Sequence, residues 1–245
     1  MRTRTGATAN GAATFTQRKR RDQLVECTIE AIVELGYSRT TVAEVARRAG
    51  VSKGVVTYHF PAKDDLIQAV ISDVIAEMGE YLEPRLRAAD PLQYPERFIA
   101  AYLTNWTDYI QTHGRDVLAL VRVYNAFRDE TGRPNPAFDV RATDITVVGQ
   151  LLRHGQQTGR LGSFDPNIMA TVMKAALDDL LNQYAANPEL DLQAYGAELV
   201  VLFERATRPD HVPATGPVPA SQQETTRDQV DRVLPRRNNE RQSRR

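Results

Sequence analysis

Residues 40–66 read TTVAEVARRAGVSKGVVTYHFPAKDDL, and this stretch decides the fold of the amino-terminal part. Thr41 followed by Glu44 has the spacing of a capping box, which predicts that a helix begins there. Gly50 is a natural end for that helix, and Ser52 is a suitable N-cap for the next one. Two short helices joined by a tight turn are typical of a helix-turn-helix, whose second helix can enter the major groove of DNA.

Apolar residues around this stretch predict the core that fixes the two helices. Four of them recur at helical spacing and are expected to be buried: Val42, Val45, Val56 and Phe60. Similar apolar stripes predict a first helix over 22–35 and a fourth helix that begins after Lys63. The helix-turn-helix is thus expected inside a small helical domain.

Taken as a whole, this stretch resembles the signature of the tetracycline-repressor (TetR) family. The resemblance covers residues 18–70. It implies an all-α fold, with an amino-terminal three-helix helix-turn-helix DNA-binding domain and a carboxy-terminal antiparallel helical domain for ligand binding and dimerisation. It also implies a one-component transcriptional regulator, most often a repressor, that a small-molecule effector releases from a palindromic double-stranded DNA operator.

The candidate DNA contacts lie in the second and third helices and just beyond: Thr40, Thr41, Lys53, Gly54, Val55, Thr57, Tyr58, His59 and Lys63. Lys53 can contact a phosphate or a guanine edge, or it can be a solvated lysine. Gly54 can let the backbone approach DNA closely, or it can pack against the first helix. The resemblance implies phosphate contacts for Tyr58 and His59, although His59 can instead be a packed histidine.

Three of these candidates have further interpretations. Lys63 and the hydroxyl of Thr40 or Thr41 can reach a phosphate, but Thr41 can also be only a cap. Thr57 departs from the resemblance, because many relatives have a tyrosine or another aromatic residue at this position. A threonine hydroxyl reaches less far than a tyrosine hydroxyl. The contacts with the DNA backbone, or the bases that are read, are therefore expected to differ.

The charges are segregated along the chain, although the 31 basic and 31 acidic side chains cancel. Residues 1–66 carry a net charge of +4, residues 67–207 carry −7 and residues 208–245 carry +3. The positive amino-terminal part is suited to DNA, and the arginines before residue 22 either add salt-dependent attraction or are solvated. The zero total therefore does not exclude nucleic acid.

Beyond the helix-turn-helix the pattern stays helical, and no segment alternates like a strand. Helices are expected over roughly 94–112, 115–130, 136–159, 165–186 and 190–207. The predicted organisation is a disordered arm at 1–16, the DNA-binding domain at 17–66, an effector-binding and dimerisation domain at 67–207, and a disordered tail at 208–245.

Aromatic residues repeat along one face of the helix predicted over 94–112 and again on the next helix. Such a stripe is either core or the wall of a ligand pocket. The resemblance implies a ligand cavity in this region, and aromatic walls with few polar groups suit an apolar or aromatic effector. The candidate effector contacts are Phe98, Tyr102, Asn105, Trp106, Tyr109, His113, Tyr124, Asn125, Phe127 and Met173.

The helices at about 165–186 and 190–207 carry two wide apolar stripes. They fit a four-helix homodimer interface made by two copies, where the resemblance also implies it, or they close the core of one monomer. A dimer suits the proposed role, because two recognition helices about 34–36 Å apart reach successive major grooves.

Other function classes have little support in the residues. The histidines lack metal-ligand spacing, and no phosphate loop, dinucleotide fingerprint or nucleophile elbow is present, so no metal, cofactor or enzymatic activity is predicted. An all-helical adaptor, or an enzyme without a recognisable site, remains the alternative. A single cysteine and the lack of a long apolar run predict a soluble cytoplasmic protein that does not enter a membrane.

Overall fold

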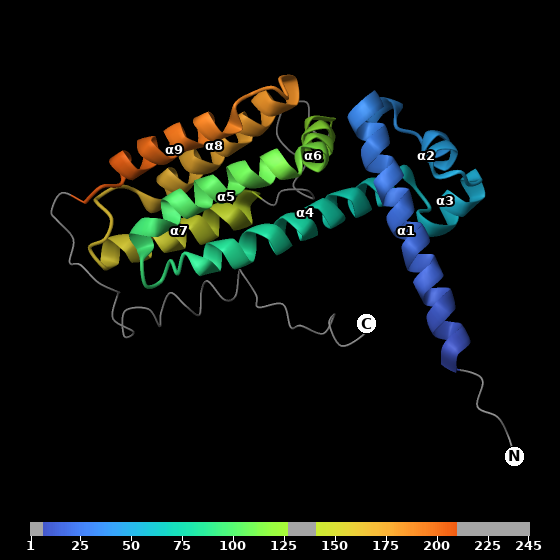
Figure 1. Ribbon diagram of the computed structural model, residues 1–245, viewed down its shortest axis with the longest axis horizontal. Coiled ribbons are helices and arrows are strands. Elements are labelled where there is room, and N and C mark those ends of the chain that lie inside the picture. Colours follow the sequence, from blue (N-terminus) through green and yellow to red (C-terminus); the bar gives the residue numbers. More distant parts are fainter. Residues whose placement is uncertain (1–6, 127–140, 210–245) are drawn as a thin grey trace, which may run out of the picture. The chain divides into compact units, whose positions relative to one another are not determined.

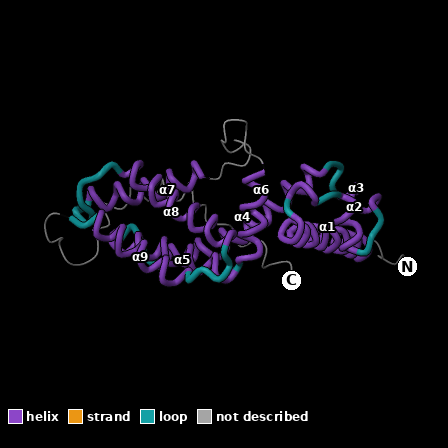
Figure 2. The backbone as a smooth tube through the Cα atoms, turned by 90° about the horizontal axis from the view of Figure 1, so that it is seen from above, coloured by secondary structure: helices purple, strands orange, loops and turns teal. Residues whose placement is uncertain are grey.

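The structure, a computed structural model, describes residues 7–126 and 141–209, which form helices and loops without a strand among them (Figure 1). The helices are α1 (Ala7–Leu35), α2 (Val42–Ala49), α3 (Lys53–His59), α4 (Lys63–Ala88), α5 (Phe98–Thr112), α6 (Gly114–Ala126), α7 (Arg141–Gln157), α8 (Pro166–Ala186) and α9 (Leu192–Ala206), with short 3-10 turns at Tyr37–Arg39 and Pro95–Arg97. Figure 2 shows the same elements as a tube, and the all-α prediction is confirmed. No helix among the described residues is long and apolar enough to span a membrane.

Helix α1 begins at Ala7, whereas the apolar pattern predicted a first helix from residue 22. The reason is intrinsic propensity: four alanines lie between residues 7 and 13, and alanine is the strongest helix former. Periodicity could not detect this part of the helix, because an amphipathic pattern requires an apolar face that is buried against a core.

By their contacts, the described helices form two compact units. Unit 1 contains α1, α2, α3, the part of α4 up to Glu77, and α6, whereas unit 2 contains α4 from Met78 onward, α5, α7, α8 and α9. The predicted domain boundary after residue 66 stays a prediction. Helix α6, expected in the effector-binding domain, packs on α1 within unit 1. Residues 1–6, 127–140 and 210–245, which include nearly all of the predicted tail, lie outside the described residues.

The core of unit 1 holds α2 and α3 against α1. Val45, Val56 and Phe60 are buried as expected, and Val42 is partly buried against the same cluster. Residues of α4 and α6 complete the cluster: Leu66, Ile67, Ala69, Val70, Ile71, Val74, Ala119, Leu120 and Val123. Burial of this apolar surface fixes the orientation of α3 within unit 1.

The caps of α2 and α3 explain why these short helices begin and end where they do. The Thr41 hydroxyl accepts a hydrogen bond from the Glu44 N–H at 3.2 Å, and the Ser52 hydroxyl accepts one from the Val55 N–H at 3.4 Å. Gly50 ends α2 with a φ of 65°, a left-handed conformation that glycine adopts without strain. Only half of the predicted capping box forms, because the carboxylate of Glu44 binds two arginines.

In unit 2, α5 packs along α9 and α7 packs along α8 (Figure 1). A Cβ atom on Gly196 of α9 would lie 2.6 Å from the Thr107 hydroxyl oxygen of α5, so glycine permits the close approach of these two helices. The side chains of Asp165 and Asp191 cap α8 and α9 by accepting hydrogen bonds from backbone N–H groups of the first turn.

Candidate nucleic-acid interface

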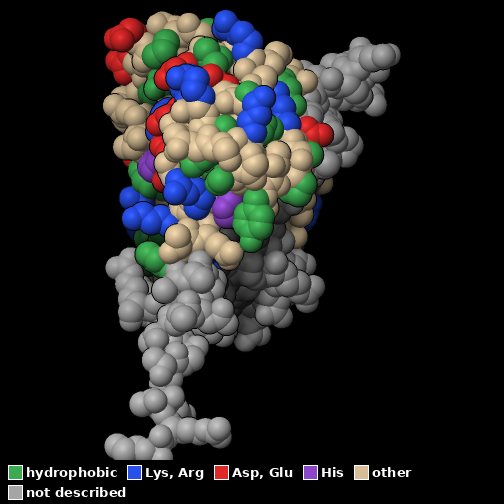
Figure 3. Space-filling model, turned by 90° about the vertical axis from the view of Figure 1, so that its right-hand side faces the viewer, with side chains coloured by type: hydrophobic (Ala, Val, Ile, Leu, Met, Phe, Trp, Pro, Cys, Tyr) green, Lys and Arg blue, Asp and Glu red, His purple; other side chains and the backbone are tan. Residues whose placement is uncertain are grey.

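Helix α3, the second helix of the helix-turn-helix, has one buried side and one exposed side. Val56 faces the core with no exposed surface, whereas Tyr58 is 71 % exposed. Lys53, Gly54 and Thr57 are also exposed, and Val55 and His59 are half-buried. Figure 3 shows a face of unit 1, with basic side chains spread over it and acidic ones toward its upper part and edges. This exposed side of α3 is the surface on which DNA contacts are predicted.

Tyr58 is held in place by a residue that sequence reasoning missed. Its phenol oxygen lies 3.3 Å from Nε2 of Gln17, and its ring lies edge-on to His59 with ring centroids 5.2 Å apart. Gln17 belongs to the early part of α1 that was expected to border a disordered arm. No local signal could have revealed this contact, because the two residues are 41 positions apart.

Gly54 does not need to be a glycine for packing. A Cβ atom at this position would lie 3.6 Å from the Ser52 hydroxyl oxygen, an ordinary contact, and would meet nothing from α1. The alternative of close packing against the first helix therefore has no support. No side chain projects from α3 at Gly54, which is compatible with the predicted close approach of the backbone to DNA.

Two predicted contacts are engaged inside the protein. Thr40 has only 1 % of its surface exposed, and its hydroxyl donates to the Gly36 carbonyl at 3.0 Å, so its position gives no support to a phosphate contact. The Lys63 ammonium donates to the Tyr37 carbonyl at 2.9 Å and lies 3.9 Å from the centroid of the Tyr37 ring. Burial lowers the pKa of Lys63. Both residues were predicted from chain position alone, which does not reveal their neighbours.

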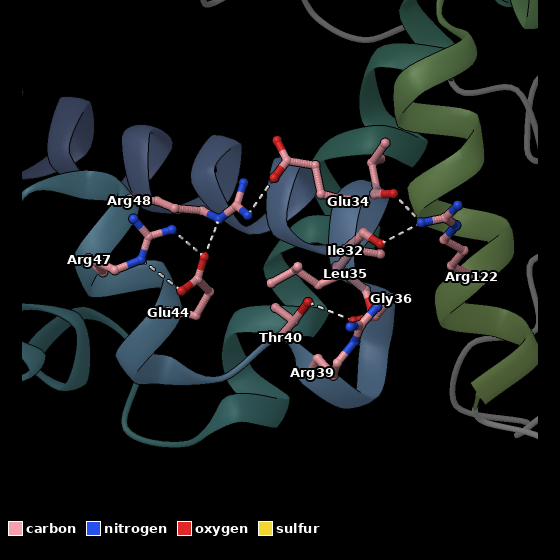
Figure 4. A network of polar contacts seen from close by, with 11 residues as sticks. Ile32, Glu34, Leu35, Gly36, Arg39, Thr40, Glu44, Arg47, Arg48 and Arg122 are labelled. Atoms are coloured by element: carbon pink, nitrogen blue, oxygen red, sulfur yellow. Dashed lines mark hydrogen bonds and ion pairs between the residues drawn. The ribbon is translucent and has the colours of Figure 1, made fainter.

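Two arginines of α2 bind glutamates of unit 1 (Figure 4). Arg47 and Arg48 both contact the carboxylate of Glu44 at 2.7 Å, and Arg48 also contacts Glu34 of α1 at 2.6 Å. Hydrogen bonds from Arg47 and then Arg48 lower the pKa of Glu44 to about 2. Part of the positive charge counted in this segment therefore stabilises the α1–α2 junction and is not free for DNA.

The carboxyl end of α1 is capped by three side chains, one from α6 and two from the segment that follows α1 (Figure 4). Arg122 of α6 donates to the carbonyl of Ile32 at 3.1 Å and to that of Val33. Arg39 donates to the Leu35 carbonyl at 2.9 Å, in addition to the bond from Thr40 to Gly36. These donors bind carbonyls in the last turn of α1 and at Gly36, where a helix end leaves some acceptors without intrahelical partners. Helix α6 is thereby attached to the helix that packs beneath α2 and α3.

The aromatic stripe of α5 lies inside unit 2. Phe98, Tyr102, Trp106 and Tyr109 are each at most 6 % exposed, and successive ring centroids are 5.6, 6.4 and 6.4 Å apart. Met173 of α8 is fully buried. The four aromatic candidates are thus brought together in one continuous packed series, which serves as core in this structure.

A polar cluster interrupts this aromatic core. The Tyr102 hydroxyl donates to a carboxylate oxygen of Asp144 at 2.7 Å, and burial raises the pKa of Asp144 while nearby Lys174 opposes that rise. The Lys174 ammonium lies 2.7 Å from a carboxylate oxygen of Asp178 and 5.0 Å from the centroid of the Trp106 ring. Asp144, Lys174 and Asp178 were absent from the candidates, because their partners lie on other turns and helices.

The remaining effector candidates are dispersed. Asn105 donates its side-chain amide to the Ala101 carbonyl at 2.7 Å. His113 lies 3.8 Å from a carboxylate oxygen of Glu77, and Tyr124 packs against the core of unit 1. Asn125 is exposed, and Phe127 lies outside the described residues. His113, Tyr124 and Asn125 belong to unit 1, whereas the aromatic series of α5 belongs to unit 2.

An exposed apolar surface covers parts of α8 and α9. Ile168 is 64 % exposed, Val172 is 49 % exposed and Leu202 is 58 % exposed. With their neighbours they line a shallow hollow whose members are Phe164, Asp165, Ile168, Met169, Val172, Leu202, Phe203 and Ala206. Other residues of the two stripes close the core of unit 2: Met173, Leu177, Leu180, Leu192 and Leu199. The two stripes thus divide between the core and an open face.

Known proteins resemble the chain at two levels. Residues 24–70 match the family of bacterial regulatory proteins called the tetR family. The chain is 36 % identical over 89 residues to the HTH-type transcriptional regulator BetI of Serratia proteamaculans (strain 568), covering 36 % of this chain and 45 % of that one. It is 41 % identical over 69 residues to BetI of Escherichia coli O139:H28, covering 28 % of this chain and 35 % of that one. The chain thus spans less than half the length of these curated relatives.

Solved structures share the fold over a longer range. The fatty acid degradation regulator FadR from Bacillus halodurans has a TM-score of 0.62 and 18 % identity, over 76 % of this chain and 94 % of that one. SmeT, the repressor of the Stenotrophomonas maltophilia multidrug efflux pump SmeDEF, has a TM-score of 0.61 and 22 % identity, over 81 % and 95 %. Likeness at this identity concerns the fold, whereas the helix-turn-helix also matches in sequence. Residues 24–70 thus match the tetR family of bacterial regulatory proteins in sequence, and the chain shares its fold with solved regulators.

Proposed function

We propose that the protein is a homodimeric repressor that binds a palindromic DNA operator and releases it when a small molecule binds in unit 2. The observation that carries the DNA-binding part is the exposed side of α3, where Lys53 and Tyr58 stand beside Gly54 over the buried Val56. On this helix, Lys53 supplies a cation and Tyr58 a hydroxyl donor, and Gly54 has no side chain to block close approach. This combination suits phosphate and base contacts in a major groove.

The open apolar face of α8 and α9 supports the homodimer. Ile168, Val172 and Leu202 would each be covered if two copies formed a four-helix bundle, and contiguous exposed apolar surface is typical of interaction sites. Pairing also makes operator binding effective, since two α3 helices engage two half-sites at once.

The core of unit 2 supports an effector with apolar or aromatic character. Tyr102 and Trp106 provide aromatic surface, and the half-buried Asp144 and the buried Lys174 provide polar partners that could select among ligands. An effector causes release only by binding the DNA-free geometry more tightly than the DNA-bound one. Among the proteins of similar fold, SmeT is named as a repressor, which supports repression as the mode of control.

The DNA-binding part is tested by selecting bound sequences from a pool of random duplexes with the full chain. We expect a palindromic consensus, and we expect Lys53→Ala and Tyr58→Phe each to weaken binding to it by about tenfold, because each removes a phosphate donor or base contact. Lys53→Ala should also reduce the salt dependence of binding.

The matched control is Arg153→Ala, which removes an exposed cation from α7 in unit 2. We expect it to bind the consensus like the wild type, and all variants should keep their helix content by circular dichroism. Unchanged affinity in both α3 variants would contradict the placement of the DNA-binding surface. Enrichment of no sequence at all would contradict the DNA-binding function itself.

A further inference from the structure

We propose that Thr57 recognises the 5-methyl group of a thymine through its own methyl group and makes each operator half-site depend on a thymine opposite α3. This inference rests on the proposed DNA-binding function and goes beyond it, because it names the base and the chemical group that are read. It also explains how a short side chain serves at a position where a long aromatic one was expected.

The hydroxyl group of Thr57 is engaged within its own helix. Its oxygen Oγ1 donates toward the Lys53 carbonyl at 3.1 Å and the Gly54 carbonyl at 3.2 Å. A hydroxyl has a single proton, so this proton is shared between two backbone acceptors of the preceding turn. It is therefore not available for N7 or O6 of guanine, N7 of adenine or O4 of thymine.

The methyl group of Thr57 takes no part in these hydrogen bonds and can serve as the contact group. The Cβ atom carries one hydroxyl and one methyl group, and the side chain is exposed. On the major-groove edges of the four bases, the 5-methyl of thymine is the apolar group that a threonine methyl can contact. A methyl–methyl contact removes apolar surface of both partners from water, which favours binding.

The neighbours of Thr57 allow so short a side chain to reach a base. Gly54 lies one turn earlier on the same side of α3 and has no side chain to hold the helix away from the groove floor. Lys53 and Tyr58 are long and exposed, so they can extend to phosphates while α3 lies deep. A short side chain of α3 would thus contact a base, while long side chains of the same helix would contact phosphates.

The test compares Thr57→Ser, which keeps the hydroxyl and removes the methyl, with Thr57→Val, which keeps the methyl and removes the hydroxyl. These exchanges change helix propensity little, so both variants should fold. On the consensus duplex selected by the wild type, we expect Thr57→Val to bind within about twofold of the wild type. We expect Thr57→Ser to bind about fourfold more weakly per half-site, or about fifteenfold for a dimer, from the loss of one buried methyl group.

The DNA is changed in the same way, by replacing single thymines with deoxyuridine, which lacks only the 5-methyl group. One position in each half-site should weaken the wild type and Thr57→Val and leave Thr57→Ser unaffected, because the contact is already lost. Thr112→Ser is the matched control: its hydroxyl donates to the Asp108 carbonyl at 2.8 Å, it is exposed, and it lies in unit 2. This variant should bind like the wild type.

Weak binding by Thr57→Val together with normal binding by Thr57→Ser would overturn the inference and assign the reading to the hydroxyl. A consensus in which no deoxyuridine replacement affects the wild type would overturn it as well. Neither result affects the proposed function, which fails only if the wild type selects no sequence from the pool.

Discussion

Two glutamates, Glu34 and Glu44, bind arginines of the helix-turn-helix and so reduce the positive charge available for the proposed DNA contact. Glu44 holds Arg47 and Arg48, and Glu34 holds Arg48 from the other side. The hydrogen bond and charge of Arg48 also lower the pKa of Glu34. A carboxylate with a lowered pKa stabilises the folded state most where it is ionised in both states. The contribution of these two glutamates to the stability of the fold therefore decreases as the pH falls and they become protonated.

We predict that Glu44→Gln removes a pH-dependent part of the stability. In the wild type this part is fully present above pH about 4.5, the ordinary pKa of the group, and is lost as the pH falls toward about 2. The difference in melting temperature between wild type and variant should therefore shrink over that interval. Thermal unfolding at a series of pH values measures it, with exposed Glu198→Gln of α9 as the control. A difference independent of pH would contradict the assignment.

At the scale of elements, α6 is attached to α1 by two arginines in different surroundings. Arg122 is partly buried and donates to the Ile32 and Val33 carbonyls at the end of α1. Loss of this donor would leave these carbonyls with fewer hydrogen bonds. Arg115 pairs with Glu26, and both side chains are close to half exposed, at 45 % and 48 %. Water and salt screen the second contact but act less on the first.

We predict that Arg122→Met lowers the free energy of unfolding by about 2 kcal/mol, because hydrogen bonds from a charged donor are lost while the apolar stem is kept. Arg115→Met should cost less than about 1 kcal/mol, as is usual for an exposed ion pair. Urea unfolding followed by circular dichroism measures both. Equal losses for the two variants would show that the bonds to the carbonyl ends of α1 have no special role.

At the scale of the whole molecule, the proposed function requires two copies and a separation of charge. The acidic middle segment, with a net charge of −7 over residues 67–207, is unsuited to phosphate, whereas the first 66 residues carry +4. The apolar face of α8 and α9 is the surface through which unit 2 would pair with a second copy.

We predict that Leu202→Asp and Ile168→Asp each convert the protein to a monomer, because a carboxylate would be buried in the apolar interface without a partner. Both positions are more than half exposed, at 58 % and 64 %, so the fold of one chain should persist. Sedimentation equilibrium should report half the wild-type mass, and operator binding should fall by about a hundredfold with the loss of the second half-site.

The control for the interface is Glu204→Lys, an exposed position two residues further along α9 and on another side of the helix. It changes more charge than either aspartate variant and should leave the mass unchanged. Dimers that persist in both aspartate variants would locate the interface elsewhere.

Local sequence determined most of what is local in this protein. Thr41, Gly50 and Ser52 set the limits of α2 and α3 through caps that involve only neighbouring residues, and helical spacing revealed that Val56 and Phe60 are core. The resemblance of residues 18–70 to the TetR family agrees with the family match over residues 24–70. The early start of α1 was missed, since alanine propensity acts there without an apolar face.

Only the tertiary structure decided which polar side chains remain available. Thr40 and Lys63 are occupied by backbone carbonyls, Arg48 is held by a glutamate of α1, and Tyr58 is positioned by Gln17, 41 residues away. Such contacts depend on which helix faces arrive together after folding, which spacing along the chain does not encode. Capping and amphipathic burial act within a few turns and can be read from sequence, whereas hydrogen bonds between helices exist only once the core has fixed their geometry.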